Sequence, residues 1–214
     1  MRIISSLLFL ALLLSSCGGE KNRKVEIQTE FGNMKVELFN STPVHRDNFI
    51  KLANEGFYDD LLFHRVISNF MIQGGDPNSK GAAPGQSLGT GGPGYTIDHE
   101  INEKHFKGRL SAARQGDAVN PEKKSSGSQF YVVQGTPVSR TQLESMGARS
   151  GLTYTDEEIQ IYESAGGTPH LDNDYTVFGQ VVEGLEVIDK IAAVQCDARN
   201  RPLEDIKMKV VVID

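Results

Sequence analysis

The sequence predicts a mainly β fold, a closed antiparallel barrel with a helix near each end of the chain. Short apolar runs rich in β-branched residues recur along the whole chain and are separated by turns containing glycine and asparagine. Two stretches, one early and one late, show helical spacing of apolar residues. Many short strands with few helices favour a capped barrel, although composition alone also allows a β-sandwich.

Composition narrows the class of protein. The chain has 214 residues, of which 38% are hydrophobic and 23% are charged, as in ordinary globular proteins. It carries 22 Lys and Arg against 28 Asp and Glu, a net charge of −6. Because there is also no basic stripe, we expect no nucleic-acid partner.

The amino terminus predicts export. Met1-Arg2 precedes an apolar run over residues 3–14 that is too short to span a bilayer, which needs about 20 residues, and so indicates a secretion signal. The following Leu-Ser-Ser-Cys resembles the lipobox of bacterial lipoproteins. We therefore predict a signal peptide over residues 1–16, an acylated Cys17 and a tether over residues 17–24. The alternative is an ordinary signal peptide with an incidental cysteine.

This interpretation predicts a lipid-anchored protein of the bacterial cell envelope that faces the periplasm. More than one acyl chain on Cys17 would anchor it stably to the membrane. The remaining cysteine, Cys196, has no partner for a disulfide in the mature chain. The hydrophobic core alone must then stabilise the fold.

The first elements follow directly after the tether. Residues 25–29 and 33–38 read as a hairpin around Glu30-Phe31-Gly32. Thr42 as cap and Pro43 in the first turn predict the start of a helix, which Gly56 ends.

The remaining strands are predicted at residues 61–67, 70–73, 109–112, 129–133, 177–182 and 208–213. The second helix spans residues 185–194, where Leu185, Ile188 and Ile191 share one face. Residues 134–169 contain two capping-box patterns, beginning at Ser139 and Thr155, and predict two short helices. This segment is either a structure beside a functional site or an inert surface excursion.

The hairpin of residues 61–73 is unusual for a core element. Alternation predicts Phe63 and Arg65 on one face and His64 and Val66 on the other. A guanidinium among aromatic side chains is costly to cover unless it is hydrogen-bonded or partly hydrated, so this surface predicts a site. The alternative is a core hairpin whose arginine reaches solvent at the edge.

The same stretch, F-H-R-V-I-S-N-F-M-I-Q-G-G-D over residues 63–76, resembles the signature of the cyclophilins, which are peptidyl-prolyl cis–trans isomerases. Further similarity lies in Gly-Thr-Gly-Gly at 89–92, Gly-Ser-Gln-Phe-Tyr at 127–131, Leu-Asp at 171–172 and Val-Phe-Gly at 177–179. The resemblance implies an eight-stranded barrel capped by two helices over residues 25–214. It also implies isomerase activity without a cofactor or metal.

The resemblance assigns the site residue by residue. Arg65 would donate a hydrogen bond to the prolyl nitrogen, and Gln73 would bind substrate or position Arg65. The catalytic set is Arg65, Phe70 and Gln73, and the substrate-binding set is Phe63, Met71, Ala113, Arg114, Gln129, Tyr131, His170, Leu171 and Tyr175.

Three of these positions depart from the family pattern. Arg114 stands where the family usually has asparagine, and its contact is expected through the backbone. Tyr175 replaces the common histidine and keeps an aromatic wall. His170 replaces the tryptophan of cyclosporin-sensitive members.

Two functions remain at this stage. The first is a monomeric isomerase of unfolded or exported proline-containing polypeptides. The second is a non-catalytic module that binds proline-containing peptides on the same fold. The Arg65, Phe70 and Gln73 set favours the enzyme, because a mere binder does not need it.

Three other motifs indicate different functions, but each lacks the neighbouring residues or elements that its function requires. Residues 85–89 fit G-x-S-x-G, yet no strand precedes and no helix follows, as a serine-hydrolase elbow requires. The glycines of residues 89–94 lack the Lys-Ser/Thr of a phosphate loop, and His99-Glu100 is followed by a histidine at the wrong spacing for zinc. We expect no hydrolase, phosphate or metal site.

Overall fold

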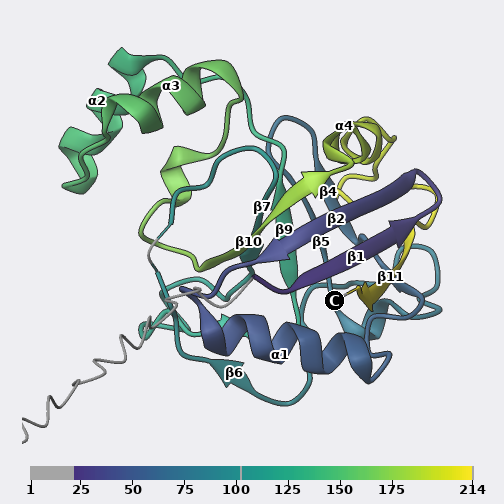
Figure 1. Ribbon diagram of the computed structural model, residues 1–214. Helices are drawn as coiled ribbons and strands as arrows, with labels where there is room; N and C mark the ends of the chain where they lie inside the picture. Colours follow the sequence, from purple (N-terminus) through teal and green to yellow (C-terminus); the bar gives the residue numbers. More distant parts are fainter. Residues whose placement is uncertain (1–21, 102, 214) are drawn as a thin grey trace, which may run out of the picture.

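A computed structural model describes residues 22–101 and 103–213 (Figure 1). One antiparallel sheet dominates it, and its strands in chain order are β1 (Lys24–Thr29), β2 (Gly32–Leu38), β3 (Leu61–Leu62), β4 (Arg65–Ile67), β5 (Met71–Gly74), β7 (Arg109–Ala112), β9 (Phe130–Val133), β10 (Val177–Glu183) and β11 (Lys207–Val212). A separate ladder pairs β6 (Thr96–Ile97) with β8 (Ser125–Ser126), and neither strand was predicted.

The sheet curls until its two edges meet. Its strand order is β3-β11-β1-β2-β10-β7-β9-β5-β4, so the list begins and ends with strands separated only by Phe63 and His64. One stretch of chain therefore pairs with β11 on one side and with β5 on the other. Counted as one interrupted strand, β3 and β4 complete the eight-stranded barrel that was predicted.

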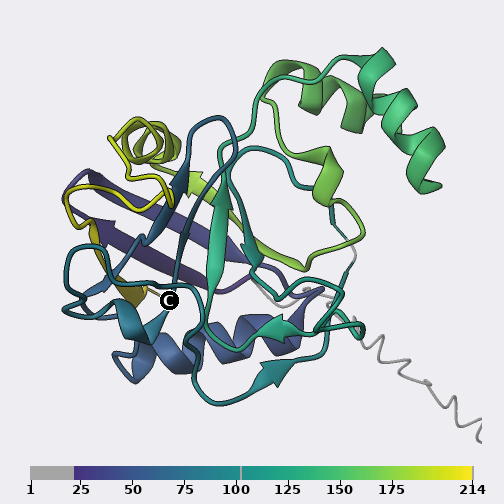
Figure 2. The same cartoon turned by 180° about the vertical axis from the view of Figure 1, so that it is seen from behind.

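Two helices cover the barrel as expected. α1 (Pro43–Asn54) and α4 (Leu185–Ala192) lie on opposite sides of the sheet in both views (Figures 1 and 2). They bury Phe49 and Leu52 from α1, and Ile188 and Ile191 from α4, against the strand residues that point inward. Each such side chain contributes about 1.5–3 kcal/mol through burial, which fixes the helices to the barrel.

The start of α1 differs from the prediction in its chemistry. Thr42 occupies the cap position, but its side chain makes no capping bond. The carboxylate of Glu100 accepts hydrogen bonds from the backbone N–H groups of Val44 and His45 instead, at 3.2 and 3.0 Å. A residue far along the chain thus satisfies the free donors of the helix, which local sequence could not reveal.

The long insertion forms an arm, defined as residues 134–169, that projects from the barrel (Figures 1 and 2). Both predicted helices are present, α2 (Arg140–Ser150) and α3 (Asp156–Ser164), each with a complete capping box. The arm has its own small core of Val138, Leu143, Ile159 and Tyr162, which packs on Phe106 of the barrel domain. The 3-10 turn η2 (Pro169–Leu171) then returns the chain to the sheet.

The glycine-rich loop after β5 is fixed by a buried carboxylate. Asp76 is fully buried and accepts from the backbone N–H groups of Asn78 and Gly89, at 2.8 and 2.5 Å. Asn78 lies in the short 3-10 helix η1 (Pro77–Ser79). Gly75 has φ +86°, and a Cβ there would lie 2.2 Å from the carbonyl oxygen of Ser128. Only glycine therefore allows this turn to approach β9.

Most predictions for the amino terminus concern residues that the structure does not describe. The signal peptide and the acylated Cys17 lie outside the described residues. Lys24, predicted as the end of the tether, is instead the first residue of β1, and the carbonyl of Arg23 accepts a hydrogen bond from the N–H of Leu38. Within the described ranges, none of the helices has the length and apolar character that crossing a bilayer requires.

Candidate active site

The site is built on the outer face of three neighbouring strands. Strand pairing places Arg65 of β4 opposite Gln73 of β5, and Gln73 opposite Tyr131 of β9. Side chains alternate between faces, so Met71 lies on the same face as Gln73 while Ile72 points into the barrel core. Three strands distant in sequence thus present one continuous row of functional groups.

A directed chain of hydrogen bonds runs along this face. Arg65 donates from Nη1 to Oε1 of Gln73 at 3.1 Å, and Nε2 of Gln73 donates to Oε1 of Gln129 at 3.1 Å. Nε2 of Gln129 in turn donates to the carbonyl of Gly91 at 2.7 Å. Each amide has one donor and one acceptor in use, so the chain fixes the position of the guanidinium.

An apolar cluster lies beside the arginine. Met71, Ala113, Tyr131 and Val133 are buried there, and partly buried side chains surround them. This cluster forms one side of a cavity of about 350 Å³, which we call the main cavity. Its predicted members are Arg65, Phe70, Met71, Gln73, Ala113, Arg114, Tyr131, Leu171 and Tyr175. The structure therefore brings nine of the predicted residues together.

Two further predicted residues, Gln129 and His170, lie outside the lining of the main cavity. Gln129 lines an adjoining groove of about 660 Å³ that shares Gln73, Ala113 and Arg114 with the main cavity. His170 is exposed and lies outside the lining of the cavity, with its ring 5.4 Å from that of Phe70. Burial of part of the ring lowers the pKa of His170 and so favours its neutral form.

Phe63 does not reach the cavity, and the predicted alternation is wrong at this point. Phe63 is 1% exposed and packs inside the barrel against Phe130, at 6.2 Å between ring centroids. Val66 shares that core, whereas His64 and Arg65 both line the cavity. The cause is the interruption between β3 and β4, which shifts the alternation where the chain changes its pairing partner.

Arg114 and Tyr175, which both depart from the family pattern, are in contact with each other. The guanidinium of Arg114 lies over the ring of Tyr175, 4.5 Å from its centroid. Nε of Arg114 also donates to the carbonyl of Asp174 at 2.9 Å, and Nη1 pairs with Asp117 at 2.5 Å. We expected the contact of Arg114 to be made largely by its backbone, but its side chain is 5% exposed and forms part of the wall.

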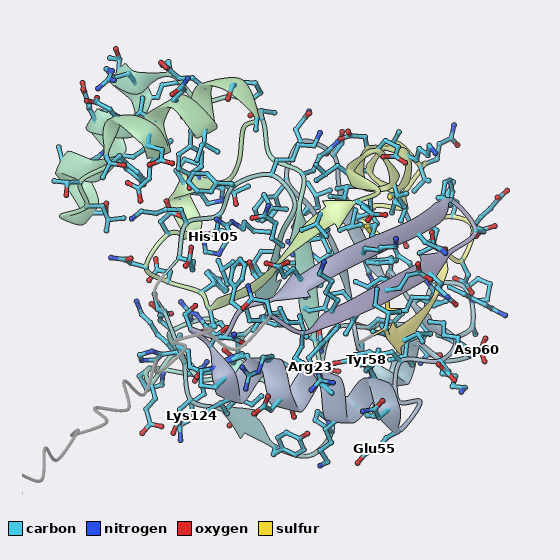
Figure 3. All side chains as sticks on the ribbon, viewed as in Figure 1. Arg23, Glu55, Tyr58, Asp60, His105 and Lys124 are labelled. Carbon is cyan, nitrogen blue, oxygen red and sulfur yellow. The ribbon has the colours of Figure 1, made fainter. Side chains whose placement is uncertain are left out.

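Behind the wall lies a buried polar network. Asp172 accepts at Oδ1 from the N–H of His105 (2.8 Å) and lies 3.0 Å from its Nδ1, while Oδ2 accepts from the hydroxyl of Tyr162 at 2.7 Å. The hydroxyl of Tyr131 lies 3.0 Å from Nε2 of His105. Figure 3 shows His105 on the side of the barrel from which the arm projects. Burial raises the pKa of Tyr131 well above its usual value, so the hydroxyl stays protonated.

Sequence reasoning missed the rest of the lining of the main cavity. It consists of His64, Gln86, Ser87, Leu88, Gly89, Asp197, Arg199 and Arg201. His64 lay within the recognised signature but had no assigned role. The 197–201 loop carried no motif, and only the fold brings it beside β4, where the N–H of Val66 donates to the carbonyl of Asn200 at 2.8 Å.

The remaining motifs have other roles. Ser87 lies in a loop with no strand before it and no helix after it, so it is not on a hydrolase elbow. Glu100 satisfies the first turn of α1, as described above. Within residues 22–101 and 103–213, no group of three or more histidine, cysteine or acidic side chains is arranged to hold a metal.

An arginine held by amides beside an apolar cavity, on a closed antiparallel barrel, defines the class of barrel-type peptidyl-prolyl isomerases. The family model described as "Cyclophilin type peptidyl-prolyl cis-trans isomerase/CLD" matches residues 24–213. The chain belongs to this family, and it is a peptidyl-prolyl cis–trans isomerase.

Bacterial relatives agree with this assignment. A Staphylococcus aureus (strain USA300) protein, provisionally named a peptidyl-prolyl cis-trans isomerase, is 35% identical over 192 residues, covering 89% of this chain and 91% of that protein. A Streptococcus pyogenes protein, provisionally named a bifunctional phosphatase/peptidyl-prolyl cis-trans isomerase, is 38% identical over 197 residues. The match covers 89% of this chain but 38% of that longer protein.

Solved structures confirm the fold. The crystal structure of a Cryptosporidium parvum cyclophilin type peptidyl-prolyl cis-trans isomerase has a TM-score of 0.64 and 26% identity, covering 90% of this chain and 98% of the other. A second structure of that protein, in the presence of the dipeptide Ala-Pro, gives a TM-score of 0.63 with 90% and 99% coverage.

Proposed function

We propose that the main cavity is where this isomerase acts and that Arg65 is its catalytic residue. Rotation about an X–Pro bond is slow because the nitrogen lone pair is delocalised into the carbonyl, with a barrier of ~18–20 kcal/mol. As the bond twists, the lone pair localises on the nitrogen and becomes a better hydrogen-bond acceptor. A donor fixed beside the ring therefore binds the twisted state more strongly than either planar state.

The single observation that carries this proposal is the chain from Arg65 through Gln73 and Gln129 to Gly91. It holds the guanidinium in place before substrate arrives, so little reorganisation is needed during the reaction. Met71, Phe70, Tyr131 and Leu171 supply the apolar surface for the proline ring. The groove that contains Gln129 then takes one flank of the peptide.

The alternative that the sequence left open was a binding module without catalysis. Retention of an apolar seat would suffice for it, whereas the fixed arginine favours the enzyme. The deciding experiment measures cis–trans exchange in a short Ala-Pro peptide by NMR, with and without purified protein. Exchange that the protein accelerates and that Arg65→Ala abolishes supports the proposal. Binding without acceleration would leave only the module.

We also propose that the protein acts as a monomer on exported, proline-containing polypeptides in the bacterial envelope, on the periplasmic side of a membrane. The support is the sequence alone, a short apolar leader followed by Leu-Ser-Ser-Cys at residues 14–17. Acylation of Cys17 would anchor the protein, and the few residues up to Asn22 would join the anchor to the barrel.

A further inference from the structure

Among the residues that line the main cavity, Arg199 carries a positive charge that has no ion-pair partner in the described part of the chain. Arg199 is exposed, and within the described chain its guanidinium makes no ion pair or hydrogen bond. Arg65 has the neutral amide of Gln73 as its side-chain partner and likewise no carboxylate within the described residues. Four arginines therefore line one cavity in a protein whose net charge is −6. Arg114 and Arg201 pair with carboxylates, whereas Arg65 and Arg199 do not within the described residues.

The nearby carboxylate does not neutralise this charge. Among the described residues that line the cavity, Asp197 is the acidic one. Its Oδ1 already accepts from the backbone N–H groups of Arg199 and Arg201, at 2.8 and 2.9 Å. These bonds, with the two nearby guanidinium groups, keep the pKa of Asp197 below its usual value. The carboxylate is therefore used to shape the loop that presents Arg199.

Arg201 shows what a structural arginine looks like in the same loop. It is 7% exposed and donates to the carbonyls of Ala82 and Ala83, at 3.2 and 2.7 Å, and to the carboxylate of Asp205 at 2.9 Å. Its charge is paired and its donors are used within the fold. Arg199, two residues away, has none of these partners, so its donors remain available to a ligand.

A second, independent observation comes from His64. Its side chain is 4% exposed and lines the cavity, yet neither ring nitrogen makes a hydrogen bond of normal geometry within the described chain, although the carbonyl of Leu62 lies near. Buried polar atoms are normally hydrogen-bonded, so a partner from outside the protein is expected here. Arg65 and Arg201 both act on this ring electrostatically, and Asp76, which acts on it more strongly, makes no hydrogen bond with it.

We propose that Arg199, Arg65 and His64 form a carboxylate subsite beside the proline seat, so that the enzyme prefers X–Pro segments with a glutamate or aspartate close to the proline. The proposal rests on the main cavity being the isomerase site. Guanidinium and carboxylate groups match in geometry, and such charge-assisted bonds are stronger than neutral ones. Arg65 serves both the twisted amide and the edge of this subsite.

The experiment compares peptides that differ only in Glu or Gln, placed immediately before the proline or one or two residues after it. All peptides are acetylated and amidated, and one arm with a free C-terminal carboxylate separates a side chain from a chain end. Both kcat/KM from exchange NMR and Kd from titration are measured. We expect one Glu position to exceed its Gln partner by about 3- to 10-fold at low salt, and the ratio to approach one at about 0.5 M salt.

Variants assign the effect to Arg199. The readout is the ratio of Glu to Gln peptide, so a general loss of activity cancels. Arg199→Gln should remove the preference, and Arg199→Glu should invert the ratio in favour of the Gln peptide. Arg149→Gln is the matched control, because Arg149 is an exposed arginine on α2 that bonds within its own helix. It should keep the wild-type ratio.

Two results would overturn the subsite. One is a ratio within 2-fold of unity at every position, in both rate and Kd. The other is an equal loss of preference in Arg149→Gln, which would assign the effect to the overall field of the protein. If no peptide is isomerised, the assignment of the cavity as the isomerase site fails instead, and the Kd ratios still decide whether carboxylates bind there.

Discussion

The hydroxyl of Tyr131 lies 3.0 Å from Nε2 of His105, and this contact joins the apolar seat of the active site to the arm. Nδ1 of His105 faces Asp172, which also accepts from Tyr162 of α3. A His105 ring that donates from Nδ1 and accepts at Nε2 satisfies every partner in this chain. The insertion is therefore bonded to the site rather than attached to the surface alone.

This network predicts different effects for two tyrosines. Tyr162 is fully buried, whereas Tyr154 is half-buried, and both donate to Oδ2 of Asp172, at 2.7 and 3.1 Å. Tyr162→Phe should lower the free energy of unfolding by about 1 kcal/mol, and Tyr154→Phe by less, because water can replace the exposed bond. Urea denaturation of the two variants checks this order, which equal losses would contradict.

Asp172→Asn should cost more than either tyrosine variant. An amide nitrogen cannot accept, so at least one buried donor of the network loses its partner, at a cost of about 1–3 kcal/mol. The arm depends on these bonds, so we also expect faster tryptic cleavage at Arg140 and Arg149 than in wild type. Unchanged stability and unchanged cleavage would show that the arm is held by its apolar contacts alone.

Arg65→Ala tests the mechanism. Removing a preorganised donor from a developing charge typically costs about 2.7–4 kcal/mol of barrier, so we expect a 100- to 1000-fold loss of kcat/KM. The fold should persist, since the side chain bonds only to Gln73 among the described residues. Arg65→Lys serves as the matched control and should retain part of the activity, because it keeps charge but not planar geometry. Near-normal turnover in the folded alanine variant would refute the assigned role.

Most of the fold could be predicted because its signals are local. The helical spacing of the late helix and the capping boxes at Ser139 and Thr155 depend on neighbours in the sequence, and the structure confirms both. The cap of α1 could not be predicted, because Glu100 reaches it through the fold. The predicted face of Phe63 was wrong for a related reason, because the alternation of side chains breaks where the strand changes its pairing partner.

The residues of the site likewise divide into those that the sequence identified and those that only the fold brings together. Family resemblance located the predicted site residues, and nine of them meet in the cavity, five of which come from the hairpin and β9. The wall that contains Arg199 and Arg201 follows no motif, because tertiary packing alone brings that loop to β4. The stacking of Arg114 on Tyr175 could not be predicted either. The sequence showed two separate departures from the family pattern and did not show that the two side chains touch.

Stability should fall between pH 7 and pH 5. Burial lowers the pKa of His64 and of His45, although Glu100 lies 2.6 Å from His45 and opposes the shift there. Above the unfolded pKa of about 6.5 both rings are neutral in both states and impose no penalty. As the pH falls below that value, the unfolded chain takes up protons that the folded chain resists, so the free energy of unfolding decreases.

Urea denaturation at pH 7 and pH 5 measures this decrease, above the range where most carboxylates titrate. His64→Gln removes one of the two rings and should lessen the decrease, and more so than a substitution of the exposed His170. An equal decrease in wild type and His64→Gln would exclude His64 as its source.

The proposed lipid anchor gives a cellular prediction. Wild-type protein should fractionate with membranes and carry Cys17 as its mature first residue. Cys17→Ser should remain uncleaved by the lipoprotein signal peptidase and lack the acyl chains. Soluble wild-type protein with a different mature terminus would leave the ordinary signal peptide as the explanation.

His170 leads to a prediction about inhibition. The residue replaces the tryptophan of cyclosporin-sensitive relatives, and its imidazole, 5.4 Å from the ring of Phe70, offers a smaller apolar face at the edge of the site. Losing a large aromatic contact and one hydrogen bond should weaken cyclosporin by about two orders of magnitude. Catalysis should change less, because Met71 and Tyr131 of the apolar seat are unaffected.

His170→Trp should therefore restore part of the sensitivity while the rate with an Ala-Pro peptide stays within a few-fold. The arm offers a competing cause, since η2 places His170 directly after α3 and the helices could limit access for a large ligand. A variant with α2 and α3 replaced by a short turn, made with and without His170→Trp, separates the two causes. Sensitivity regained only on shortening assigns the resistance to the arm, and nanomolar inhibition of the wild type contradicts both explanations.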